Sequence, residues 1–376
     1  MLPLFNKLSN HYRLIIAERE KGRIPYIDLI KGFAIICVVY IHIVGNYSDT
    51  LPIRMVNNLR MPLFVFMSGF FFKEYGGFRD FATRKICKIL IPFFFFLVLF
   101  WICRPISLLI HPLKHVSSGF SLDMLMKSCE TPIWFLACLF CICIFFYDFQ
   151  QLTRKWHFVA KLVVLTAIGA GAYYAFPPLQ NYIARYNGDV AQYYILFQPI
   201  LALALMPLYF LAVELKKSGL AQKRIHPFVR VAIFAVGITL WILCAQQGIE
   251  LKHLHLGKNL LFFYISALGG IAVVWSVMSL LVWLPYVSYL GRYSIIILGS
   301  HMSAYIIAAP LCHWKHTPII IVMAILCPII IAVFKHFLPY LCAQKDLLVL
   351  GTDNHMHFAP EVKSRLNRIF RKNSSK

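Results

Sequence analysis

Residues 89–110 read ILIPFFFFLVLFWICRPISLLI, an apolar stretch in which Arg104 is the single charged side chain. A helix that crosses the hydrocarbon core of a membrane needs about 20 residues of this kind. Nine other stretches of similar length are predominantly apolar. The sequence therefore predicts an all-α, polytopic membrane bundle of about ten transmembrane helices, at 27–45, 55–72, 89–110, 133–149, 159–177, 194–213, 229–247, 259–282, 293–310 and 318–341.

The composition favours a membrane protein over the other large classes. Of the 376 residues, 60% are hydrophobic and only 14% are charged, whereas a soluble domain carries about 25% charged residues. Too little polar surface remains to cover a water-facing protein, which excludes a soluble enzyme, a disordered chain and a nucleic-acid-binding module. The formal net charge of +22 then predicts cytoplasmic loops that face anionic lipid, rather than a polyanionic partner.

The distribution of basic residues predicts the orientation of the helices. With ten spans, both termini and every second loop share one side of the membrane, and 28 of the 37 Lys and Arg residues lie there. Because Lys and Arg concentrate in cytoplasmic loops, we expect both termini in the cytoplasm. The predicted organisation is a cytoplasmic N-terminal segment (1–25), a ten-helix membrane domain (26–345) and a basic cytoplasmic tail (346–376).

The tail contains a second, weaker helical pattern. Val362, Leu366 and Ile369 stand at helical spacing between Pro360 and Lys372, among five basic residues. This pattern predicts a short amphipathic helix on the inner membrane surface. The alternative is a solvated tail.

The first span carries three ionisable side chains on one helix face. Lys31 and His42 are eleven residues apart, which is three turns plus about 20° of rotation and about 16 Å along the helix axis. Asp28 lies within about 40° of the same stripe. Ionisable side chains inside a membrane are costly and by default mark a functional site. The alternative is that Asp28 and Lys31 snorkel to the interface while His42 caps a neighbouring helix.

A basic cluster follows the second span. Arg84, Lys85 and Lys88 lie within five residues of one another in a predicted cytoplasmic loop. Such a cluster fits two ligands, either lipid phosphates at the membrane surface or the phosphates of a cytosolic cofactor.

Three single residues are further candidates for a substrate pocket. Ser68 lies next to Gly69 in the second span, where the helix can break or approach a neighbour closely, and it is a distant candidate nucleophile. Trp134 opens the fourth span, at a depth where an aromatic residue usually anchors the helix at the interface. His301 is a second imidazole, near the middle of the ninth span.

We expect neither a metal site nor a disulfide framework. His253 and His255 lie in a short external loop with Glu250 as the only further ligand type at suitable spacing. Most of the eleven cysteines fall inside or at the ends of apolar runs, where cysteine behaves as a small buried hydrophobe.

Taken in order, these motifs resemble the acyltransferase-3 family of bacterial multi-span O-acyltransferases, and among them the sugar O-acetylase-like members. The family's basic residue, ten residues and a histidine in the first span are matched by Lys31 and His42. Residues 61–70, with Met-Pro-Leu-Phe and Ser-Gly-Phe, are similar to its second-span motif. Residues 134–136 (Trp-Phe-Leu) are similar to its fourth-span motif, and residues 291–301 to a late motif that ends in histidine.

The resemblance implies a reaction and its participants. The donor would be cytosolic acyl-CoA, most often acetyl-CoA, and the acceptor a hydroxyl of a cell-surface glycan or lipid-linked sugar, in the bacterial cytoplasmic (inner) membrane. His42 would be the general base, Lys31 would steer the donor or hold phosphate, and Asp28 would fix Lys31 by pairing with it. Relatives often carry two arginines separated by two residues in the first cytoplasmic loop, whereas this chain has Lys85 and Lys88, preceded by Arg84. The resemblance therefore implies donor binding by this cluster without deciding which member contacts the cofactor.

A transporter or flippase for a glycolipid is the competing hypothesis. It also needs buried charge, helix breaks and a polar path through the membrane, but it usually shows a duplicated half. The sequence shows no such duplication. A scaffold without chemistry is disfavoured, because it would gain nothing from burying both Lys31 and His42.

Overall fold

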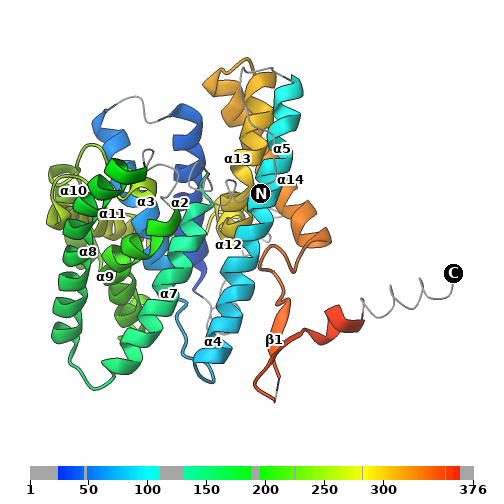
Figure 1. The fold of residues 1–376 in the computed structure, drawn as a ribbon. Helices are drawn as coiled ribbons and strands as arrows, with labels where there is room; N and C mark the ends of the chain where they lie inside the picture. The colour runs from blue at the N-terminus through cyan, green and yellow to red at the C-terminus, as the bar shows by residue number, and fades with distance from the viewer. Residues whose placement is uncertain are drawn as a thin grey trace, which may run out of the picture. The chain divides into compact units, whose positions relative to one another are not determined.

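The computed structural model describes residues 24–45, 49–110, 131–187, 195–223, 226–281, 283–351 and 353–364. Helices make up nearly all of this part of the chain (Figure 1). In chain order the elements are α2 (Pro25–Val44), α3 (Leu51–Gly69), α4 (Phe78–Lys85), the π-helix η1 (Ile86–Leu90), α5 (Ile91–Ile110), α7 (Trp134–Leu152), α8 (Phe158–Asn187), α9 (Gln198–Lys217), η4 (Leu220–Gln222), α10 (Pro227–Leu243), η5 (Leu251–His253), α11 (Leu260–Leu281), α12 (Pro285–Arg292), α13 (Ser294–Leu311), α14 (His316–Phe337), β1 (Leu348–Leu350) and β2 (Met356–Phe358).

Each of the ten predicted spans coincides with a helix of the structure. Among the described residues, eight helices are long and apolar enough to cross a membrane. The other two predicted spans are α10, which has only 17 residues, and α3, which has the length but carries Arg54, Asn57, Asn58 and Arg60. The multi-pass helical architecture is therefore confirmed, while the number of ten crossings and the cytoplasmic termini remain predictions.

The prediction of a loop around the basic cluster is wrong, because this region is helical. Its location on the cytoplasmic side stays a prediction. α4 begins at Phe78 and continues through η1 into α5. Asp80 and Arg84 form an ion pair at i,i+4 spacing (2.9 Å), which supports an exposed helix. The π turn follows from Pro92, which has no N–H for the carbonyl of Lys88 and whose ring would clash with it in a regular helix. Ile91 N–H bonds instead to the carbonyl of Ile86, five residues back.

The chain divides into two compact units. The first unit takes the described residues up to Phe70, together with Leu211–Ile249 and Leu256–Ser294. In it, α2 packs against α3, α11 and α12, and α10 packs against α11. The core at one end of this packing is aromatic, since the ring of Trp275 on α11 contacts the rings of Tyr26, Phe66 and Phe70.

The second unit takes Phe71–Phe210, Glu250–His255 and the described residues from Ile295 onward. Its core includes a cluster of rings formed by Phe72, Phe81, Phe146 and Tyr209. On α13, a Cβ at Gly299 would overlap the ring of Phe96 on α5, so the glycine lets these two helices pack closely.

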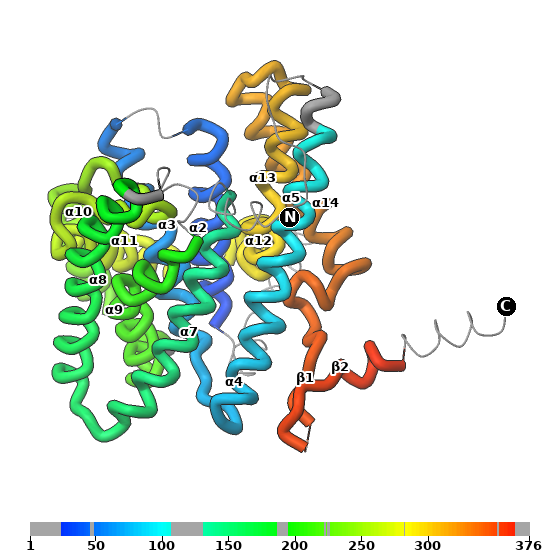
Figure 2. The backbone as a smooth tube through the Cα atoms, in the orientation of Figure 1, coloured from blue at the N-terminus to red at the C-terminus, as the bar shows by residue number. Residues whose placement is uncertain are grey.

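The tail is folded before Pro360, in a stretch for which neither helix nor strand was predicted. β1 and β2 form an antiparallel hairpin, with Leu348 opposite Phe358, and β1 lies beside α4 (Figure 2). The predicted amphipathic helix falls mostly outside the described residues, which end at Ser364 in a helical segment that begins at Pro360.

Candidate active site

The first helix of the site, α2, brings an acid and a base into contact. Lys31 Nζ lies 2.9 Å from Asp28 Oδ1, and the two side chains are only 18% and 15% exposed. The pair is local, because residues three apart lie on the same face of a helix. Asp28 also lies in the first turn of α2, after Pro25 at the start of the helix, where a carboxylate is favoured by the helix dipole. The predicted pairing of Asp28 with Lys31 is therefore present.

His42 lies in the last turn of the same helix, before Gly45 ends it at φ 79°. Its Nδ1 is 2.7 Å from the carbonyl oxygen of Val38, one turn back. Since a carbonyl oxygen can only accept, Nδ1 carries the hydrogen in this contact, and the neutral ring then has its lone pair on Nε2. The helix itself thus fixes both the tautomer and the orientation of a half-buried imidazole.

The position of α2 is set by a close crossing with α12. A Cβ at Gly291 would overlap the carbonyl oxygen of Asp28, and a Cβ at Gly32 would overlap the carbonyl oxygen of Val287. The two backbones therefore touch where only glycine leaves room. On α2 the crossing contacts Asp28 and Gly32, and Lys31 lies between them in the sequence. The crossing therefore positions the ion pair directly.

Ser68 is less suited to a nucleophile than to a helix bend. Its hydroxyl donates to the carbonyl oxygen of Phe64 at 2.8 Å, inside α3. A serine bonded in this way satisfies its own helix and tends to bend it. The predicted pocket role of Ser68 stays a prediction, and the structure adds no general base beside its oxygen among the contacts it describes.

The three cations of the basic cluster, Arg84, Lys85 and Lys88, lie on α4 and η1 and have different partners. Arg84 pairs with Asp80 and also lies over the ring of Tyr75, with its guanidinium carbon 4.7 Å from the ring centroid. Lys85 Nζ lies 5.2 Å from the centroid of the Phe81 ring. Lys88 reaches the segment after α14, where its Nζ lies 3.0 Å from Asp346 Oδ1.

Trp134 and His301 are both core residues of the second unit. Trp134 is 6% exposed at the start of α7 and meets the ring of Phe135 edge-on at 5.9 Å. His301 is 1% exposed on α13, and its Nδ1 lies 2.8 Å from the carbonyl oxygen of Ile297. His301 therefore repeats the arrangement of His42, with a ring oriented by the carbonyl one turn back.

The predicted site residues fall into two groups by unit. Asp28, Lys31, His42 and Ser68 belong to the first unit, in which Asp28 and Lys31 are in direct contact. The cluster of Arg84, Lys85 and Lys88, together with Trp134 and His301, belongs to the second unit.

Sequence reasoning missed three polar residues, of which Asp80 and Asp346 pair with cations of the basic cluster. Asp80 had a readable signal, since it stands four residues before Arg84 on a helix. Asn58 is fully buried on α3 and donates to the carbonyl oxygens of Arg54 and Gln246. Asp346 gave no signal, because its contact with Lys88 depends on the fold of the tail.

The loop with Glu250 is an ion-pair cluster. His253 Nδ1 lies 3.0 Å from Glu250 Oε2, and Lys252 Nζ lies 3.1 Å from Glu250 Oε1. The hydrogen bond from His253 lowers the pKa of Glu250 to about 2, against an opposing effect of partial burial. No group of three or more metal-ligating side chains occurs among the described residues.

A comparison with known protein families identifies the family of this chain. A family model described as an acyltransferase domain matches residues 24–336, which is most of the chain. The chain belongs to the acyltransferase-3 family. Its apolar helices and this family make it a multi-pass membrane acyltransferase. A search of curated proteins found no match to this chain. The match ends before the tail, so the hairpin beside the basic cluster lies outside the family's domain.

Proposed function

We propose that this acyltransferase moves an acyl group, most often acetyl, from cytosolic acyl-CoA to a hydroxyl of a cell-surface or lipid-linked saccharide. The observation that carries the proposal is the arrangement of α2, where a paired lysine near one end and an oriented imidazole near the other share one helix. The imidazole has its lone pair on Nε2, as a general base requires. We place the protein in the bacterial cytoplasmic membrane, with both termini in the cytoplasm.

The proposed reaction has two proton transfers, and both involve His42. The acceptor oxygen attacks the thioester carbonyl carbon, the new C–O bond forms, and the C–S bond breaks. His42 Nε2 takes the proton of the hydroxyl and gives it to the leaving sulfur of coenzyme A. The Nδ1–H bond to Val38 keeps the ring aligned through both transfers and steadies the imidazolium that forms between them.

The charged groups suit an anionic donor. Coenzyme A carries its phosphates at the end remote from the thioester, and the long pantetheine arm separates the two. Arg84, Lys85 and Lys88 on α4 and η1 supply cations for the phosphates. Lys31, held by Asp28 at 2.9 Å, would meet the arm or its acyl end. With α2 entering from the cytoplasm, Lys31 and His42 would lie about 16 Å apart along the path of the acyl group.

The proposal is tested by following the thioester. Membranes that contain the acyltransferase are given acetyl-CoA and an extract of lipid-linked saccharides, and the release of coenzyme A thiol is measured against membranes from cells without the protein. We expect saccharide-dependent thiol release and acetyl ester on the saccharide. Saccharide translocation without thiol release would instead identify a flippase and contradict the proposal.

Neutralising the basic cluster is expected to weaken donor binding. Changing Arg84, Lys85 and Lys88 to glutamine removes three charge-assisted contacts to phosphate, so the KM for acetyl-CoA should rise by about tenfold or more. The change in kcat should be smaller, because these contacts are the same in the ground state and the transition state. The measurement is initial rate against acetyl-CoA concentration at several salt concentrations.

The matched control removes cytoplasmic charge elsewhere. Arg154 and Lys155 follow α7 and are exposed, so their change to glutamine lowers the positive charge of the predicted cytoplasmic face without touching α4. We expect this control to leave KM within about twofold of wild type, as exposed charges contribute little. An unchanged KM in the triple variant would contradict donor binding by the cluster. It would favour the alternative, in which the cluster contacts lipid phosphates.

Deleting residues 360–376 is expected to leave transfer activity intact. The deletion keeps the hairpin, Asp346 and all ten predicted spans. Among the described residues, the side-chain contacts that it removes are those of Glu361 with Lys345 (3.0 Å) and with the hydroxyl of Tyr340 (2.8 Å). Exposed ion pairs of this kind are worth little. The measurement is transfer activity at equal membrane abundance. Complete loss of activity at normal abundance would place the end of the tail in the active site.

A further inference from the structure

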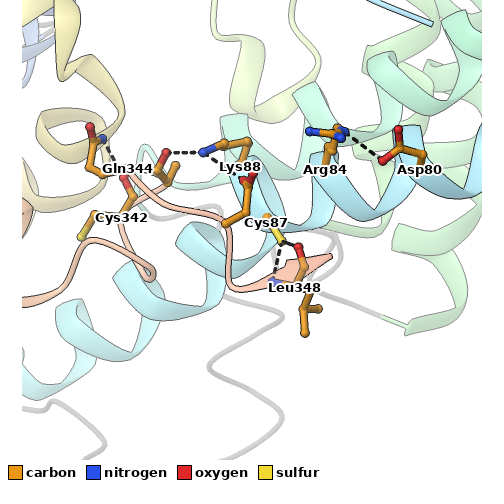
Figure 3. A network of polar contacts seen from close by, with 9 residues as sticks. Asp80, Arg84, Cys87, Lys88, Cys342, Gln344 and Leu348 are labelled. Atoms are coloured by element: carbon orange, nitrogen blue, oxygen red, sulfur yellow. Dashed lines mark hydrogen bonds and ion pairs between the residues drawn. The ribbon is translucent and has the colours of Figure 1, made fainter. Parts of the chain in front are cut away.

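The segment that follows α14, residues 338–361, is docked on the helix that carries the basic cluster; we call this segment the clasp. Its strand β1 lies beside α4. The buried thiol of Cys87 on η1 accepts a hydrogen bond from the N–H of Leu348 (3.3 Å) and donates to its carbonyl oxygen (3.4 Å) (Figure 3). Ala359 N–H bonds back to the carbonyl oxygen of Leu347 (2.9 Å) and closes the clasp on itself.

The clasp contacts one cation of the basic cluster, Lys88. Lys88 Nζ donates to the carbonyl oxygen of Ala343 at 3.0 Å and pairs with Asp346 Oδ1 at 3.0 Å. Ala343 has a φ of 63°, which is a left-handed backbone conformation that residues other than glycine rarely adopt. The loop thus holds a strained backbone conformation that presents two acceptors from residues 343–346 to a single ammonium group.

Lys88 differs in this respect from its two neighbours. Arg84 pairs with Asp80 of its own helix, and Lys85 lies over Phe81 of its own helix. Within the described residues, Lys88 is the member of the cluster whose carboxylate partner comes from another segment. That segment also lies beyond the end of the family match at residue 336.

The pairing has an electrostatic consequence for any anion that approaches η1. An ammonium group has three hydrogens. Lys88 donates one of them to the carbonyl oxygen of Ala343, and the Asp346 carboxylate lies 3.0 Å from the same nitrogen as its ion-pair partner. A phosphate that contacts Lys88 Nζ would lie within a few ångströms of the Asp346 carboxylate and be repelled by it. Lys88 can therefore serve the clasp or a phosphate, but it cannot serve both at full strength.

We propose that the clasp and the phosphates of the acyl donor compete for Lys88, so that Asp346 acts as an internal competitor that weakens donor binding. This inference rests on the proposed function, because it takes the basic cluster as the donor's phosphate site. Donor binding releases Asp346 from Lys88 and loosens β1 from α4, and the clasp in turn raises the donor concentration at which the enzyme is half saturated.

The first test is the KM for acetyl-CoA of Asp346→Asn in the full chain. The pair is partly exposed, with side chains 41% and 34% accessible, so we expect KM to fall by about threefold, with kcat unchanged. Asp346→Glu keeps the charge and should retain the wild-type KM. Asp353→Asn is the matched control, because Asp353 is an exposed carboxylate of the same hairpin that pairs with His357 instead (2.8 Å).

The second test follows the clasp directly. Hydrogen exchange at the amide of Leu348, which bonds to Cys87 Sγ, should become faster in wild type when coenzyme A is added. In Asp346→Asn the exchange should already be fast without coenzyme A.

The outcomes distinguish a failure of the proposed competition from a failure of the proposed function. Coenzyme A binding to wild type, combined with an unchanged or raised KM in Asp346→Asn, overturns the competition and leaves the proposed function standing. Slower exchange at Leu348 on adding coenzyme A does the same, since it would mean that the clasp assists binding. A wild-type protein that neither binds coenzyme A nor consumes acetyl-CoA overturns the proposed function, and the competition with it.

Discussion

His42→Ala is expected to lower the rate of acyl transfer by a factor of about 10² to 10⁴, the usual contribution of a general base. The substitution removes the Nε2 lone pair that would take the acceptor's proton, and it removes the Nδ1 contact with Val38 (2.7 Å). That contact lies within the last turn of α2, so the helix and its packing should persist. The measurement is thiol release from acetyl-CoA at equal membrane abundance.

His336→Ala is the matched control for this prediction. His336 also lies in the last turn of a membrane helix, α14, but it is exposed. It should keep the wild-type rate. His42→Gln should be as inactive as the alanine variant, because an amide has no basic nitrogen at neutral pH. Transfer at the wild-type rate in either His42 variant would remove His42 from the reaction.

Gly291→Ala should have the largest effect on the folded protein. The added Cβ would overlap the carbonyl oxygen of Asp28, which belongs to the backbone of α2 and cannot rotate away. The two helices must then separate, and overpacking that shifts the backbone costs about 1–3 kcal/mol, occasionally more. We expect a clear fall in the thermal midpoint of the detergent-purified protein, together with a loss of activity, because Asp28 and Lys31 move with α2.

The control for this prediction is the same substitution at an open position. Gly171 lies on α8, and a Cβ there would meet nothing within 4 Å. Gly171→Ala should be neutral or slightly stabilising, since alanine is the better helix former. If Gly291→Ala kept the midpoint and the activity of the control, the close approach of α2 and α12 would not be required for the fold.

The parts of the structure that the sequence predicted are those that depend on local chemistry. Long apolar runs set the ten helices, because a membrane leaves few alternatives to a helix for a stretch such as residues 89–110. The Asp28–Lys31 pair follows from three-residue spacing on one helix. Neither feature depends on contacts with distant parts of the chain.

The features that escaped prediction depend on distant contacts or on small backbone adjustments. Lys88 meets Ala343 across 255 residues of sequence, and no spacing rule relates them. The hairpin of β1 and β2 has three residues in each strand, which is too short for an alternating pattern to stand out. The π turn of η1 has a readable cause in Pro92, but a proline four residues into an apolar run is equally compatible with a kink.

The crossing of α2 with α12 also has a consequence for how the protein is made. Gly32 and Gly291 are separated by about 260 residues of chain, and ribosomes add about 5 to 20 residues per second. α2, with its charged Asp28–Lys31 pair, therefore waits roughly 10 to 50 s for the helix that completes its packing. During that interval the nascent helix needs a protective neighbour, such as the insertion machinery. A substitution at Gly291 would leave α2 without this packing partner even after synthesis, and cellular proteases lower the abundance of proteins that are destabilised in this way.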